Sequence, residues 1–142
     1  MIIQCITNSF RAEMLQGVHD LSTDVLKLAL YTGSANLYPT TTAYTATGEV
    51  VATGYTAGGE ILTGVTINTG TASTTDPAVV YVGFNNLTFN AALTARGALI
   101  YNTSKANRSV AVIDFGADKT STATFTVQMP ANTSTTALLR FP

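Results

Sequence analysis

The chain has 142 residues, of which 46% are hydrophobic, and its formal net charge is −1. A chain of this length can bury about 68–70% of the surface that its unfolded form exposes, so we expect one domain over residues 1–142. Charged residues make up only 11% of the sequence, compared with about 25% in typical soluble domains. The seven Lys and Arg residues lie far apart along the chain, which argues against nucleic acid or an anionic membrane as a partner.

The first predicted element is a short helix over Phe10–Leu21, capped by Asn8 or Ser9. Glu13 is expected in the first turn, where a negative charge is favourable to the helix dipole. His19 is expected near the C-terminal end of this helix, where it can bond a free carbonyl. Five apolar residues at helical spacing predict a stripe that packs on a sheet or, alternatively, on a neighbouring subunit: Phe10, Met14, Leu15, Val18 and Leu21.

The rest of the chain predicts strands and turns. Short runs rich in β-branched and aromatic residues alternate with Gly, Pro, Asn, Asp and Ser, and no βαβ rhythm is present. We therefore predict an all-β fold, a β-sandwich or jelly roll with one short N-terminal helix. The predicted strands are Val25–Thr32, Glu60–Thr69, Val79–Phe84, Ala98–Tyr101, Val110–Phe115, Ala123–Gln128 and Ala137–Phe141.

Two connections stand out between these strands. Residues 33–59 are too many for an ordinary loop, and their regularly placed tyrosines and few charges predict a long, ordered arm or Ω-like loop. Gly70–Pro77 is a shorter polar loop with a predicted turn at Asp76-Pro77.

The sequence offers little for catalysis. The single cysteine, Cys5, lies in an apolar run and is expected to be a buried small hydrophobic residue. One Cys and one His are too few for a zinc site, and no nucleophile motif accompanies His19. We therefore expect no enzyme activity, no cofactor and no metal.

Some acidic residues have alternative roles. The pairs Asp20 with Asp24 and Asp114 with Asp118 could bind calcium weakly, but turn and strand-end caps are the favoured interpretation. Glycoside hydrolysis needs two acids facing across a cleft; Glu49 and Glu60 are the remaining glutamates, and the chain has no Trp.

The first 60 residues carry a more specific pattern. A short helix ending in Gly17-Val18-His19-Asp20 is followed by the strand Lys27–Thr32, and then by the arm, which reads TTAYT, GEV and GYTAGG. This motif order resembles a group of small virion proteins of tailed bacteriophages, of the kind found with head genes. The rest of the chain follows the group in strand rhythm. The resemblance implies a capsid decoration, or cement, protein: a homo-oligomer, dimer or trimer, on the outer surface of the capsid.

Such a protein is made in the cytoplasm of the bacterial host and clamps neighbouring subunits of the major capsid protein. We predict that residues 33–59 and the two termini make these contacts, with Tyr38, Tyr44, Tyr55 and Phe141 as candidate interface residues. The tyrosines have an equal alternative role, which is to tether the arm to its own β-core. A second hypothesis is a receptor-binding or carbohydrate-binding module on a tail or fibre, whose tyrosine-rich loops stack on sugars.

Overall fold

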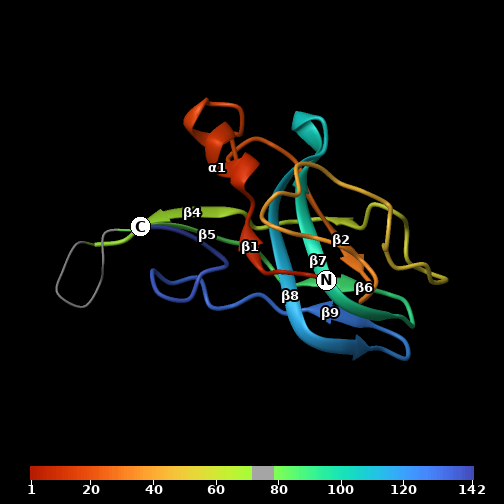
Figure 1. Ribbon diagram of the computed structural model, residues 1–142. Helices are drawn as coiled ribbons and strands as arrows, with labels where there is room; N and C mark the ends of the chain where they lie inside the picture. Colours follow the sequence, from red (N-terminus) through yellow and green to blue (C-terminus); the bar gives the residue numbers. More distant parts are fainter. Residues whose placement is uncertain (72–78) are drawn as a thin grey trace.

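The computed structural model describes residues 1–71 and 79–142 (Figure 1). Most of the predicted Gly70–Pro77 loop, including its turn at Asp76-Pro77, lies outside the described residues. Within them the chain forms one α-helix, α1 (Asn8–Leu15), and one 3-10 turn, η1 (Thr103–Lys105). The strands are β1 (Cys5–Ile6), β2 (Leu26–Tyr31), β3 (Glu60–Ile61), β4 (Thr66–Thr69), β5 (Val80–Gly83), β6 (Leu87–Phe89), β7 (Thr94–Asn102), β8 (Arg108–Thr120), β9 (Phe125–Val127) and β10 (Leu139–Phe141).

The strands pair antiparallel in three sheets. The largest has the order β1-β8-β7-β2-β3, the second β10-β5-β4, and the third pairs β6 with β9. The long β7–β8 hairpin runs through the centre of Figure 1, and residues Ala106 and Asn107 turn it at φ 55° and 58°. The predicted all-β fold is therefore confirmed.

One hydrophobic core joins the sheets. Leu28, Ile100 and Val110 on the five-stranded sheet pack in the same buried cluster as Val82 of β5 and Leu139 of β10. The β6–β9 pair adds residues such as Phe89 and Phe125 to this cluster. Successive side chains of a strand point to opposite faces, so Leu28 and Leu30 of β2 enter this cluster while Ala29 and Tyr31 lie on the other face. The jelly roll remains a prediction from the sequence.

The arm covers the other face of the five-stranded sheet. Ala35 and Leu37 are fully buried in a second cluster with Ala29 and Tyr31 of β2 and Leu99 of β7. Backbone bridges hold it there: Ile2 pairs with Leu37, and Ala43 pairs with Arg108. The arm is therefore ordered, and its first half packs against one face of the five-stranded sheet.

The helix differs from its prediction in both bounds and contacts. It starts after Thr7, which replaces Asn8 or Ser9 as the N-cap, and the Thr7 hydroxyl donates to the backbone oxygen of Val110 at 3.3 Å instead of capping the helix. It ends at Leu15 because Gly17 adopts a left-handed φ of 71°. Leu15, predicted to be part of a packed stripe, is 91% exposed.

Two strand predictions also need correction. The predicted strand Glu60–Thr69 is two strands, β3 and β4, in different sheets, because Gly64 turns the chain between them at φ 65°. The short strands β1 and β6 were not predicted. Cys5, expected to be buried, is half-exposed on β1, because this two-residue strand lies at the edge of its sheet.

Candidate interaction surfaces

A buried carboxylate organises the second half of the arm. Glu49 accepts hydrogen bonds from the Tyr44 hydroxyl at 2.5 Å, the Tyr55 hydroxyl at 2.7 Å and the Gly58 N–H at 2.7 Å. Its neighbours continue the sheet: Thr32 N–H donates to Gly48 O at 2.9 Å, and Val50 N–H donates to Leu30 O at 2.9 Å. The arm therefore closes the open edge of β2 and has its own charged centre.

Two further tyrosines from the sheet complete this cluster. The Tyr31 hydroxyl donates to Thr45 O at 2.6 Å, and the Tyr101 hydroxyl donates to Gly58 O at 2.6 Å. The rings of Tyr44 and Tyr101 stack with centroids 4.8 Å apart. Burial, followed by the Glu49 carboxylate, raises the pKa of Tyr31 and Tyr101. We call Glu49 with Tyr31, Tyr44, Tyr55 and Tyr101 the tyrosine cluster.

The three candidate tyrosines of the arm do not gather on one surface. Tyr44 and Tyr55 are half-buried and direct their hydroxyls at Glu49, and the Tyr55 ring packs 5.5 Å from the Phe89 ring. Tyr38 is half-buried, and its hydroxyl lies 3.3 Å from Asn36 Oδ1. These contacts favour the tethering role that was the equal alternative, and an interface role for the three tyrosines stays a prediction.

Sequence reasoning missed the role of Glu49, which it considered only as a glycosidase acid. The sequence does place two tyrosines close to it, with Tyr44 five and Tyr55 six residues away. Neither spacing puts two side chains together in a regular helix or strand, so the sequence pattern does not reveal the contact. Only the folded path of the arm brings both hydroxyls to one carboxylate.

A second polar network links the end of α1 to the β7–β8 hairpin. His19, whose side chain is fully buried, contacts Glu13 Oε2 through Nε2 at 2.6 Å, and Arg108 donates to Glu13 Oε1 at 3.0 Å. Asn102 uses its carbonyl oxygen to accept the Ser104 N–H, so its amide nitrogen faces His19 Nδ1 at 3.0 Å. The Asn102 amide thus lies on one side of the His19 ring and the Glu13 carboxylate on the other.

These contacts correct two helix predictions. Glu13 lies in the second half of α1 and is buried, and His19 follows the helix without bonding a helix carbonyl. Both side chains are buried because each bonds a residue of the β7–β8 hairpin: Glu13 bonds Arg108, and His19 bonds Asn102.

Asp20 and Asp24 act within a turn, whereas Asp114 and Asp118 lie inside β8. The Asp24 carboxylate accepts the Asp20 N–H at 2.9 Å and the Asn102 amide at 2.7 Å. Asp114 accepts the Gly116 N–H at 2.8 Å and Arg96 Nε at 3.1 Å, and these two contacts lower its pKa. In residues 1–71 and 79–142, no three His, Cys, Asp or Glu side chains come together as a metal site.

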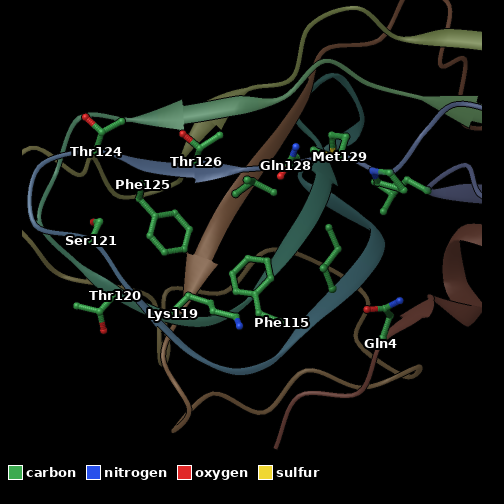
Figure 2. Close-up of a pocket in the computed structure, with 14 residues that line it drawn as sticks. Gln4, Phe115, Lys119, Thr120, Ser121, Thr124, Phe125, Thr126, Gln128 and Met129 are labelled. Carbon is green, nitrogen blue, oxygen red and sulfur yellow. The ribbon is translucent and has the colours of Figure 1, made fainter.

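A first hollow lies beside the end of β8 (Figure 2). Its volume is about 510 Å³, and the rings of Phe115 and Phe125 stand across from each other at 6.0 Å. Lys119, Gln4 and Gln128 lie around these rings in Figure 2. We call this the Phe115 groove; it combines aromatic walls with a polar rim.

A second and larger hollow, of about 840 Å³, lies between α1 and the three-stranded sheet. Met14 and Leu15 line it from the helix, and Ile67, Val80 and Phe141 line it from the strands. These strands extend past the core below α1 at the left of Figure 1. We call this hollow the α1 groove. Phe141 is the one predicted interface residue that lies in it, and its ring is 6.3 Å from Phe10.

The floor of the α1 groove is exposed apolar surface. Leu15 is 91% exposed, Ile67 49%, Val80 40% and Met14 38%. Contiguous apolar patches of this kind mark interaction sites on soluble domains. The chain is therefore an all-β protein with an apolar groove that is open to solvent.

Comparison with protein-family models, with curated proteins and with solved structures found no match to this chain. The resemblance to phage virion proteins therefore remains a prediction from sequence. Over the described residues, none of the helices has the length and apolarity needed to cross a bilayer.

Proposed function

We propose that this chain is a structural virion protein that decorates the outer surface of a bacteriophage capsid. There it clamps neighbouring major capsid subunits, as a dimer or trimer and without enzymatic activity. The α1 groove carries this proposal, because its apolar floor is left open by a chain that buries Phe10, Leu28 and Ile100 completely. The sequence pattern of the first 60 residues supports the same class.

The hydrogen bonds that fix the arm and the end of α1 support the role of a rigid capsid-stabilising protein. Glu49 fixes the arm through three hydrogen bonds, and Asn102 and His19 fix the end of α1. A decoration protein benefits from such stiffness, because a rigid contact surface loses little conformational entropy on binding. Each contact can be weak, since a capsid lattice repeats it many times.

Binding to capsids tests the proposal. Purified full-length protein is added to expanded, empty capsids assembled from the major capsid protein of the same genome, and bound protein is measured by co-sedimentation. We expect saturable binding and a higher disruption temperature of the capsid. Leu15→Glu should weaken binding by about tenfold or more, because it places a charge in the α1 groove.

The matched control is Val51→Glu, which puts the same charge on a 97% exposed residue of the arm. It should bind like the wild type if the α1 groove makes the contact. Absence of wild-type binding, or of the protein from the outer shell in a cryo-EM map of the virion, would overturn the proposal. Deleting most of the arm is a poor test, because that removes Glu49 and the buried Val50.

The Phe115 groove favours a second candidate function, a carbohydrate-binding module on a tail or fibre. Its volume of about 510 Å³ falls in the range of small-ligand sites, about 300–1,000 Å³. Aromatic walls with nearby amide and hydroxyl groups suit a sugar ring, which has apolar faces and polar edges. A glycan array tests it: we expect signals that Phe115→Ala abolishes and Val51→Glu keeps, and an empty array would contradict it.

A further inference from the structure

The outer edge of β4 adjoins the α1 groove and offers free backbone groups. Gly70 N–H donates to Val79 O at 2.7 Å, and the register pairs Asn68 with Tyr81 and Thr66 with Gly83. In an antiparallel pair, hydrogen-bonded and non-hydrogen-bonded residues alternate. The N–H and C=O groups of Ile67 and Thr69 therefore point away from β5, toward the side where β4 has no neighbouring strand among residues 1–71 and 79–142.

Among the described strands, β4 is the longest that lies at a sheet edge. It has four residues, compared with two in β1 and β3 and three in β10, β6 and β9. Proteins usually protect an edge with charge, proline or shortness. β3 contains Glu60, and β10 contains Arg140 and is followed by Pro142, whereas β4 reads Thr-Ile-Asn-Thr.

One face of this edge is continuous with the α1 groove. Ile67 pairs with Val82, and Val82 pairs with Leu139, so the three side chains share a face. Val82 and Leu139 are buried, whereas Ile67 is 49% exposed. A strand added beside β4 would therefore place every second side chain on the apolar floor.

The charges at the groove indicate what such a strand would carry. Arg11 and Arg140 both line the groove, and neither forms an ion pair with a carboxylate in residues 1–71 and 79–142. Arg140 donates through Nε to Ser134 O at 2.6 Å and lies on β10, at the opposite edge of the sheet from β4, so Arg11 is the cation nearer to a strand added there. Asp20 also lines the groove, but its carboxylate accepts the Ser22 N–H at 3.1 Å.

We infer that the β4 edge and the α1 groove bind an extended peptide segment of another protein, with alternating apolar residues and at least one acidic residue. The segment adds to β10-β5-β4 as a fourth strand beside β4, and a carboxylate that it directs across the groove pairs with Arg11. A second copy of this chain is a poorer occupant, because its own β4 has no carboxylate to offer. This inference rests on the proposed function in one respect: in a capsid decoration protein, the bound segment belongs to the major capsid protein.

Selection from a peptide library tests the inference. Random peptides about ten residues long, the upper range of a natural strand, are selected for binding to the full-length protein. The enriched peptides are synthesised, and their affinity is measured by fluorescence anisotropy at low and high salt. We expect alternating apolar residues with Asp or Glu, and weaker binding at high salt because the ion pairs are screened.

Three variants locate the binding. Thr69→Pro removes one outward N–H and should weaken binding by about tenfold or more, whereas the control Thr69→Ala keeps that N–H and should bind within about twofold. Arg11→Gln should reduce the salt dependence, because it removes the cation that pairs with the acidic residue. Circular dichroism and thermal unfolding of each variant show that the fold is retained.

Other results overturn the inference. These are a failure to enrich any peptide, equal binding to Thr69→Pro and wild type, or enriched peptides that lack acidic residues. Self-association of the wild type that Thr69→Pro abolishes would make a second copy the occupant. If Thr69→Pro still binds capsids normally, the inference fails and the proposed function stands; if peptides bind as expected and wild type ignores capsids, the proposed function fails.

Discussion

The arm and the α1 groove are built from similar apolar residues, but several of those in the arm are buried, whereas those on the floor of the groove are exposed. Both are rich in apolar or aromatic side chains, yet the arm is folded onto the sheet and the groove is open. In the arm, Glu49 satisfies three donors and Leu37 and Val50 are buried. At the groove, Ile67 and Leu15 are exposed, and no strand of the described part of the chain lies beside the outward groups of β4.

The difference shows what makes an apolar segment available for binding. A segment is closed when its polar groups find partners inside the chain, because unpaired buried donors are costly. The arm meets that condition through one carboxylate. The β4 edge does not, so its apolar side chains and outward backbone groups stay exposed.

The largest expected effect is on the closed region. Glu49→Ala should lower the free energy of unfolding by about 3 kcal/mol or more, because two tyrosine hydroxyls and the Gly58 N–H lose their acceptor. Urea unfolding measures it. Glu60→Ala, at an exposed glutamate next to the arm, should change stability by about 0.5 kcal/mol or less. Equal losses in the two variants would contradict the closed arm.

Two glycines with similar φ values sharpen the comparison. Gly59, at the end of the arm, has φ 76°, and a Cβ there would collide with the backbone of Leu28; Gly17, beside the groove, has φ 71° and nothing within 4 Å. Gly59→Ala should therefore cost about 3 kcal/mol, and Gly17→Ala about 1–2 kcal/mol. Thermal unfolding of both variants checks the order, and a reversed order would be incompatible with the packing described.

Alkaline pH should act on the closed region as well. Burial first, and then the Glu49 carboxylate, raise the pKa of Tyr31 above its usual value of about 10; burial and the hydrogen bond to Glu49 do the same for Tyr55, outweighing the Leu30 N–H. The unfolded chain loses these protons first, so stability is full below about pH 10 and falls as the pH rises above it. Each such tyrosine contributes about 1.4 kcal/mol per pH unit in that range.

The slope of unfolding free energy against pH, measured in urea above about pH 10, tests this. Tyr55→Phe removes one titrating group and should make the slope shallower. A slope unchanged by Tyr55→Phe would mean that Tyr55 does not hold its proton in the folded state.

The smallest expected effect is on the open region. Leu15→Ser should change the free energy of unfolding by about 0.5 kcal/mol or less, because the side chain is 91% exposed. Phe10→Ala, on the buried side of the same helix, should cost about 3–5 kcal/mol. Urea unfolding of both variants measures the contrast; a large loss from Leu15→Ser would show that the groove is packed in solution.

Much of the fold could be predicted from local patterns. Val25–Thr32 is apolar and Val110–Phe115 is apolar and β-branched, and these runs form the interior strands β2 and β8. Glu60–Thr69 looked like one strand because its alternation continues through Gly64, and the turn there depends on packing against two different sheets. The candidate sites were harder, since Glu49 and its tyrosines form no regular pattern.

The amino-acid sequence by itself determined the all-β class, the short helix near the N-terminus and the order of the arm, because these follow from short-range periodicity and turn chemistry. The tertiary structure decided which apolar residues are covered. Tyr44 and Tyr55 turn inward because a buried carboxylate needs donors, and Leu15 and Ile67 stay outside because α1 and β4 extend beyond the core that could bury them. That choice depends on contacts between residues far apart in the chain, which no local pattern contains.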